Sequence, residues 1–165
     1  MKHCNCTKQT ILTAILLILI AITLCIIWGH SLEGPQTSSA KSQAVLENIV
    51  KPILGPLFGA EHITELFVRK MAHFAEFFVL GTECFLLLWV RQKIRLHWVG
   101  HLFGFGFLVA ALDETLQLFT GRGSSLSDVW LDFAGYAVAA GLVLFGYWTV
   151  KILQKSSTEE LFRKE

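Results

Sequence analysis

Charged side chains are scarce in this chain of 165 residues. Asp, Glu, Lys and Arg together make up 16% of it, whereas a soluble domain carries about 25%. The local pattern is more decisive than the average. Residues 10–28 contain no charge at all, and that length is about what a ~30 Å hydrocarbon core requires. These features exclude an ordinary soluble domain and predict an integral membrane protein.

Two other features are missing. No basic block with interleaved aromatic residues occurs, so no nucleic-acid partner is expected. The four cysteines are not spaced as a disulfide framework. Cys25 and Cys84 lie inside apolar runs, and we expect both to be small buried side chains.

Three further apolar segments match the first in length, at residues 71–90, 98–119 and 129–150. The predicted fold class is therefore all-α: an integral membrane bundle of four transmembrane helices in a single domain, residues 1–165. The connecting segments are short tails at 1–9 and 151–165 and a long first loop at 29–69.

The positions of Lys and Arg predict the orientation. They cluster in the N-terminal tail, between the second and third spans, and in the C-terminal tail: Lys2, Lys8, Arg91, Lys93, Arg95, Lys151, Lys155, Arg163 and Lys164. Both termini are therefore placed in the cytoplasm. The first span is expected to stay as an anchor, because its apolar run is longer than that of a signal peptide.

The long first loop is predicted to carry short amphipathic helices. Residues 29–42 are rich in Gly, Pro and Ser, which is typical of a linker. Residues 42–54 have apolar side chains at helical spacing, and Pro52 and Pro56 limit that helix or end it. A second short helix is expected from near Glu61. The helices either lie on the outer membrane surface or form a lid.

Polar residues sit at the same ends of three of the apolar segments. Some open the second span, some close the third, one lies in the next loop and two open the fourth: Lys70, His73, Glu76, Asp113, Glu114, Gln117, Arg122, Asp128 and Asp132. Because charge in hydrocarbon is costly, such residues indicate a function by default. We predict that all nine form one ligand-binding site at the extracytoplasmic face.

Simpler explanations exist for several of them. Lys70 could anchor the helix at the interface, and Asp128 suits the first turn of a helix. Asp113 and Glu114 could support acid–base chemistry or bind a cation. They could instead form an ion pair with Arg122, His73 or Lys70 that locks the bundle. Neither interface anchoring nor capping explains Asp132, and mid-span Glu83 needs a partner, a proton or water.

Small residues in two spans predict close helix packing rather than a site. Gly135, Ala139 and Gly141 offer small surfaces in the fourth span, and Gly100-x-x-x-Gly104 does so in the third.

The polar motifs resemble those of the VanZ-like family of bacterial membrane proteins. The similarity begins at Arg69-Lys70-Met71-Ala72-His73-Phe74 and continues with Leu80-Gly81. It is strongest in Asp113-Glu114-Thr115-Leu116-Gln117-Leu118-Phe119, Gly121-Arg122 and Asp128-Val129-Trp130-Leu131-Asp132-Phe133-Ala134-Gly135. It covers roughly residues 65–144. The resemblance implies an integral membrane protein, linked in some members to reduced susceptibility to teicoplanin-type glycopeptides. Those antibiotics act at the outer surface, on cell-wall precursors.

Three functions follow from these observations. The first is binding of a lipid or lipid-linked cell-wall precursor headgroup, with Arg122 and Lys70 on its phosphate. The second is an intramembrane enzyme, with His73 as acid or base and Asp113 or Glu114 as its partner. The third is a structural or partner subunit. The polar cluster contains no cysteine and no histidine pair at zinc-ligand spacing, which counts against zinc but not against acid–base chemistry or a divalent cation held by carboxylates. We favour a non-enzymatic role and assign no metal or cofactor. A homo-oligomer remains open.

Overall fold

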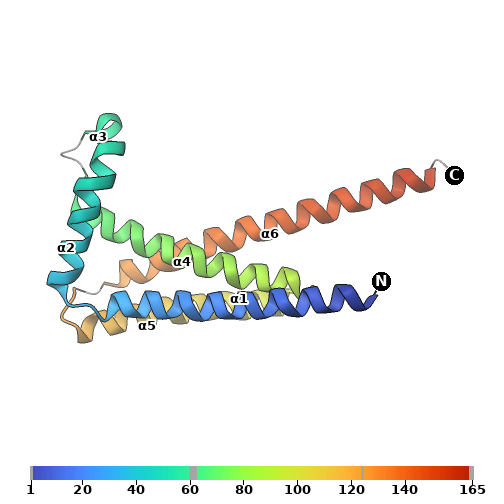
Figure 1. Ribbon diagram of the computed structural model, residues 1–165, viewed down its shortest axis with the longest axis horizontal. Coiled ribbons are helices and arrows are strands. Elements are labelled where there is room, and N and C mark those ends of the chain that lie inside the picture. The colour runs from blue at the N-terminus through green and yellow to red at the C-terminus, as the bar shows by residue number, and fades with distance from the viewer. Residues whose placement is uncertain (1, 60–62, 124, 164–165) are drawn as a thin grey trace.

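Four long helices form the body of the protein (Figure 1). The computed structural model describes residues 2–59, 63–123 and 125–163. The long helices, each of which contains a stretch long and apolar enough to cross a membrane, are α1 (Lys2–Ser31), α4 (Glu65–Val90), α5 (Leu96–Phe119) and α6 (Leu126–Arg163). No strand occurs in the described ranges. The predicted all-α fold of four transmembrane helices is confirmed.

The helices extend beyond the segments expected from apolar runs alone. Helix α4 begins at Glu65 rather than 71, because the hydroxyl of Thr64 caps it by accepting a 3.2 Å hydrogen bond from the amide of Phe67. Helix α6 continues through most of the segment 151–165 that was expected to be a tail. Its start is capped by Ser125, whose Oγ accepts a hydrogen bond from the amide of Asp128.

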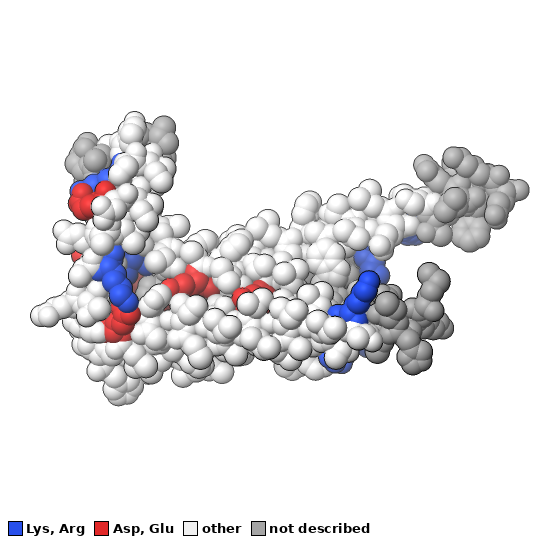
Figure 2. Space-filling model, in the orientation of Figure 1, with Lys and Arg blue, Asp and Glu red and all other residues white. Residues whose placement is uncertain are grey.

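A second group of helices lies across one end of the bundle. It comprises α2 (Pro35–Val45), the π-helical turn η1 (Leu46–Val50) and α3 (Lys51–Phe58), while both chain ends lie at the opposite end (Figure 1). Lys and Arg gather at the two ends of the molecule, and the body between them is white except for acidic patches (Figure 2). This distribution suits an apolar bundle whose ends reach the membrane interfaces.

The loop helices begin earlier than predicted. The expected linker at residues 29–42 is wrong: α1 continues to Ser31, and α2 begins at Pro35, since proline is favoured in the first helical turn. Pro52 does not end the helix either: it stands in the first turn of α3, where proline is tolerated, directly after the π-helical turn. Gly59, with φ 82°, ends α3. The helix start expected near Glu61 lies outside the described residues.

The loop helices pack against the helix bundle itself. A small buried cluster is formed by Leu46 of η1, Val68 of α4 and Ile63, which lies just before α4. This contact holds the loop helices beside the first turns of α4. A lid function for them stays a prediction.

Close helix packing occurs, although not at all the glycines expected. A Cβ on Gly135 would lie 2.4 Å from the Phe74 carbonyl oxygen, and one on Gly81 would lie 2.5 Å from that of Tyr136. These glycines let α4 and α6 approach closely. The prediction for Gly100, Gly104 and Gly141 is wrong, because a Cβ there would meet no atom within 4 Å.

The apolar core lies toward the middle of the bundle. Phe77, Leu80, Phe85 and Tyr136 are fully buried in it, and the Tyr136 hydroxyl donates a 2.9 Å hydrogen bond to the Leu102 carbonyl. Cys84 is buried as expected. Cys25 is exposed, which corrects that prediction: it sits on the outward apolar face of α1.

Candidate functional site

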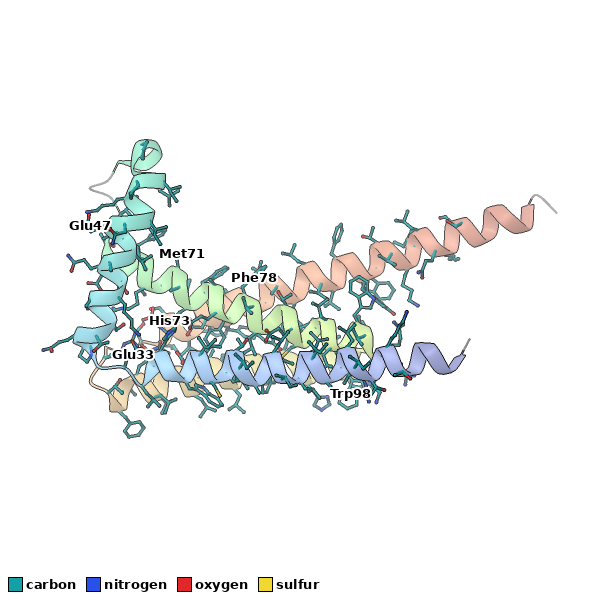
Figure 3. All side chains as sticks on the ribbon, viewed as in Figure 1. Glu33, Glu47, Met71, His73, Phe78 and Trp98 are labelled. Carbon is teal, nitrogen blue, oxygen red and sulfur yellow. The ribbon has the colours of Figure 1, made fainter. Side chains whose placement is uncertain are left out.

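The nine predicted site residues meet at the end of the bundle that carries α2. Helix α4 supplies three of them, α5 three and α6 two, and the α5–α6 turn supplies Arg122. In Figure 3, His73 lies beside Glu33 below α2, whereas Trp98 marks the opposite end of α5. The figure thus places the site at one end of the bundle. Whether these residues bind a ligand stays a prediction.

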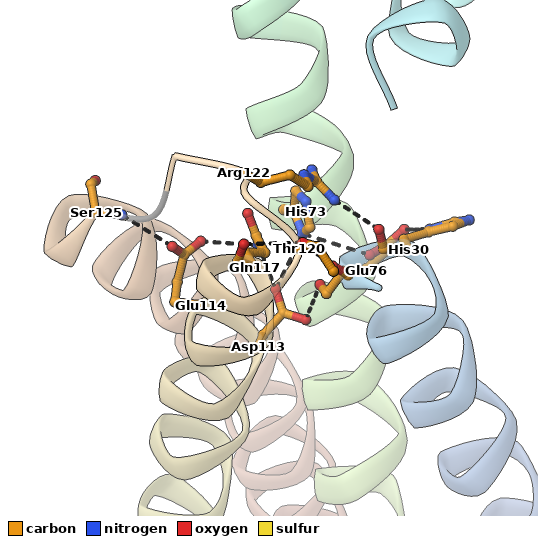
Figure 4. Close-up of polar contacts among 10 residues, drawn as sticks. His30, His73, Glu76, Asp113, Glu114, Gln117, Thr120, Arg122 and Ser125 are labelled. Carbon is orange, nitrogen blue, oxygen red and sulfur yellow. Dashed lines mark hydrogen bonds and ion pairs between the residues drawn. The ribbon is translucent and has the colours of Figure 1, made fainter. Parts of the chain in front are cut away.

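Gln117 donates hydrogen bonds to both of the adjacent carboxylates of α5, Asp113 and Glu114. Its Nε2 donates to Asp113 Oδ2 at 2.9 Å and to Glu114 Oε1 at 3.1 Å (Figure 4). A primary amide has two N–H donors, so one side chain can serve both acids. The other oxygen of Asp113, Oδ1, accepts a 2.5 Å hydrogen bond from Ser31 Oγ. All four side chains are buried.

The turn between α5 and α6 folds back so that its backbone contacts Glu114. Gly121 has φ 73°, and the Arg122 amide donates back to the Gln117 carbonyl at 3.1 Å. This closes α5 with a left-handed cap that favours glycine. The Ser125 amide then donates to Glu114 Oε2 at 3.1 Å. Glu114 therefore links the end of α5 to the start of α6.

Arg122 is buried, with only 6% of its surface exposed. Its Nη1 donates a 2.7 Å hydrogen bond to the His30 carbonyl at the end of α1, where carbonyl groups lack helical partners. Burial and the nearby Arg69 charge lower the pKa of this guanidinium. No carboxylate of the described residues lies within ion-pair distance of it, so the ion pair with Asp113 or Glu114 that the sequence left open does not form.

His30 and His73 surround Glu76. His30 Nδ1 lies 2.6 Å from Glu76 Oε1. His73 Nδ1 is farther away, at 3.9 Å from Glu76 Oε2 and 3.7 Å from Asp113 Oδ2. These two distances exceed a hydrogen bond, so His73 sits between two acids without bonding to either.

The remaining predicted residues fall into three arrangements. Lys70 pairs with Asp128, which gives both a partner across α4 and α6. Asp132 is 1% exposed and accepts no hydrogen bond from any described residue. Glu83, deeper in α4, accepts a 3.1 Å hydrogen bond from Thr23 Oγ1 of α1, which provides the partner that its mid-span position demanded.

A pocket of about 260 Å³ lies beside these residues, between α2 and α4. Its polar lining combines acids and bases from α1, α2, α4 and the α5–α6 turn: His30, Glu33, Lys41, Arg69, His73, Glu76 and Arg122. Within it Lys41 pairs with Glu33. A smaller cavity of about 20 Å³ lies on the other side of His73 and reaches Asp132.

Sequence reasoning missed several of these residues. His30 and Ser31 stand at the end of an apolar run and show no polar spacing, and Thr120 lies in a turn. Each of them contacts a residue of another helix, which the sequence does not reveal. The hydroxyl of Thr120, for example, donates a 3.2 Å hydrogen bond to the Ser31 carbonyl. Arg69 was named in the family motif, but its place in the pocket was not predicted.

A comparison with known protein families shows to which family the chain belongs. The family model described as VanZ/LLP1 matches residues 13–149. The chain belongs to the VanZ family. The match extends beyond the residues 65–144 on which the resemblance rested, and it includes the first span and the loop helices.

One similar protein is an uncharacterized membrane protein, YwnJ, of Bacillus subtilis (strain 168). It is 32% identical over 103 residues, which cover 62% of this chain and 61% of that protein. No solved structure matches the chain. The VanZ membership and this relative agree with a multi-pass membrane protein.

Proposed function

We propose that this VanZ-family protein binds the phosphate-bearing headgroup of a membrane lipid or of a lipid-linked cell-wall precursor in the pocket under α2. One observation carries the proposal. Arg69 and Arg122 line the same pocket of about 260 Å³, and among the described residues neither has a carboxylate within 4 Å.

Two guanidinium groups at one pocket favour an anion. Guanidinium groups are cationic at physiological pH, so two of them at one pocket repel each other. A phosphate would relieve that repulsion, and the planar guanidinium can bind two of its oxygens at once. The other lining charges are already paired, Lys41 with Glu33 and Glu76 with His30.

The position of the pocket suits a lipid rather than a freely soluble anion. It lies at the end of an apolar bundle, where headgroups are found, and Val45, Val68 and Ala72 line it beside the charged groups. A ligand with a phosphate and an adjoining apolar portion fits such a lining.

We further propose a bacterial plasma membrane and two cytoplasmic termini. The support is the cluster Arg91, Lys93 and Arg95, which lies at the same end as the termini. This orientation places the pocket on the extracytoplasmic side, where cell-wall precursors are exposed and teicoplanin-type glycopeptides act. Lowered susceptibility to those antibiotics in a producing host is part of this proposal.

Lipid binding to the purified full chain tests the proposal. Native mass spectrometry in detergent would compare a polyprenyl phosphate and short-chain phosphatidylglycerol with phosphatidylcholine, whose headgroup has no net charge. We expect adducts of the anionic lipids with wild type and weaker ones with Arg69→Gln and Arg122→Gln. Arg91→Gln, an exposed arginine at the opposite end of α4, is the matched control. Equal binding by wild type and both pocket variants would contradict the proposal.

A second function, acid–base chemistry on the bound headgroup, is favoured by His73. Its Nδ1 lies within 4 Å of the buried Asp113 and the half-buried Glu76, and the residue lines the pocket. This is a position that a general acid or base needs. Lipid extracts of cells producing wild type or His73→Ala would reveal it. A product present only with wild type supports catalysis, and identical extracts oppose it. The third alternative, a purely structural subunit, predicts instead that these variants fail to accumulate.

A further inference from the structure

Three side chains from three different helices converge beside the pocket. They are His73 of α4, Asp113 of α5 and Asp132 of α6, and one ligand atom of each lies within 4.8 Å of the others. Asp113 is 0% exposed and Asp132 is 1% exposed. The three groups therefore face one another in the interior of the bundle.

Asp132 provides an independent indication of a ligand. Its Oδ2 is buried and has no hydrogen-bond partner among the described residues. A carboxylate removed from water at such a place is costly unless something positive meets it. Asp113 and Glu114 are also buried nearby, and they add negative charge rather than balance it.

The cationic side chains of the site are directed elsewhere. Lys70 contacts Asp128, and Arg122 donates to the His30 carbonyl. Neither of them forms an ion pair with Asp132 in the described part of the chain, and neither does Arg69, which lines the smaller cavity with Asp132. These side chains therefore do not balance the negative charge of Asp132.

The other two groups are arranged as metal ligands usually are. Asp113 is fixed by Ser31 and Gln117, which donate to its two oxygens at 2.5 and 2.9 Å. Such outer hydrogen bonds orient a ligating carboxylate. The Nδ1 of His73 is buried and makes no hydrogen bond within the described residues, and it lies 3.7 Å from Asp113 Oδ2.

We propose that His73, Asp113 and Asp132 together bind one divalent transition-metal ion, either Mn²⁺ or Zn²⁺. An imidazole favours transition metals over Mg²⁺ and Ca²⁺. Carboxylates are preferred ligands of Mn²⁺, and Zn²⁺ accepts them beside histidine. Ligand atoms about 2.1 Å from one ion lie up to roughly 4.2 Å apart. Small side-chain rotations would therefore close the site.

This inference does not depend on the headgroup proposal, because no residue of the three must touch a phosphate. It also revises the expectation of a site without metal. That expectation rested on the lack of a local ligand motif, and a site built from three helices has none.

Metal content tests the inference directly. The full chain, stripped with a chelator in detergent, would be equilibrated with Mn²⁺ or Zn²⁺ and measured by mass spectrometry of the metal. Mn²⁺ electron paramagnetic resonance would report the bound ion. We expect about one ion per chain for wild type and loss of binding for His73→Ala and Asp132→Asn. Glu83→Gln is the matched control, since it removes a buried acid deeper in α4 that contacts Thr23 rather than the three ligands, and it should bind like wild type.

Two further measurements separate binding from folding. The melting temperature of wild type should rise with the bound metal, whereas that of Asp132→Asn should not. Ser31→Ala, which keeps all three ligands, should weaken metal affinity by about 10–100-fold. The inference is overturned if stripped wild type takes up neither ion. Equal metal loss in Glu83→Gln, or wild-type affinity in Asp132→Asn, would overturn it as well.

Discussion

Ser31 Oγ donates a 2.5 Å hydrogen bond to Asp113 Oδ1, and both residues are fully buried. The carbonyl of the same serine accepts a 3.2 Å hydrogen bond from the hydroxyl of Thr120. One residue at the last turn of α1 thus holds two positions at the end of α5. The first span is fastened to the polar cluster by a side chain that no motif marks.

Removing that hydroxyl should destabilise the bundle. In Ser31→Ala the buried oxygen of Asp113 loses its donor, so we expect the free energy of unfolding in detergent to fall by about 1–3 kcal/mol. Thr115→Ala is the control, because its exposed hydroxyl bonds only to its own helix, at the Ala111 carbonyl, and should change stability by less than about 0.5 kcal/mol. Equal effects of the two changes would contradict this prediction.

Glycines at the contact between α4 and α6 should resist substitution. Gly81→Ala and Gly135→Ala would each place a Cβ within 2.5 Å of a backbone oxygen on the facing helix, so the helices must separate, at a cost of about 1–3 kcal/mol. The same substitution at Gly104 meets open space and should stabilise by about 0.4–1 kcal/mol. Thermal unfolding of the three variants in one detergent checks the contrast, and a uniform effect would refute it.

The bundle and most of its polar end were predictable from the sequence. Apolar runs of membrane length determine helices, because a backbone in hydrocarbon must satisfy its own hydrogen bonds. Lys70, His73 and Glu76 are spaced by three, which places them near one face of a helix. Charges inside such runs stand out against their surroundings, and this is why all nine predicted residues could be named.

The partners of those residues were less predictable. His30 and Ser31 have no periodic relation to α4 or α5, and only the packing angle of α1 brings them to Glu76 and Asp113. The start of α2 was missed because residues 35–42 are polar and lack an apolar stripe. Pro35 fixes that start by backbone geometry rather than by burial.

The contact between Glu33 and Lys41 should give a measurable acid titration. Glu33 lies between α1 and α2, and the hydrogen bond from Lys41 lowers the pKa of its carboxyl. A lowered folded-state pKa means that the contact contributes above the unfolded value and is lost as the pH falls through the folded one. Carbon-13 NMR of the Glu33 carboxyl, assigned with Glu33→Gln, should show a higher midpoint in Lys41→Gln. Lys51→Gln, whose lysine pairs with Glu47 instead, should leave it unchanged.

The cellular prediction concerns teicoplanin. A sensitive Gram-positive host producing wild type should become less susceptible, and equally abundant Arg122→Ala and Asp113→Asn should not protect it. Arg122→Ala removes a buried cation from the pocket, while Asp113→Asn removes the charge of an acid fully buried in the same cluster. Arg91→Ala should protect like wild type, because Arg91 is exposed at the opposite end.

The variant Arg122→Lys, measured in the same assay, distinguishes a phosphate ligand from a general effect of positive charge. Lysine keeps the positive charge but loses the planar fork that binds two oxygens of a phosphate. Partial protection by Arg122→Lys, with membrane levels matched by immunoblot, would favour a phosphate ligand over a general effect of charge. Full protection by Arg122→Ala would instead separate the pocket from any antibiotic phenotype, and lack of protection by wild type would remove teicoplanin from the proposed function while leaving the lipid-binding test unaffected.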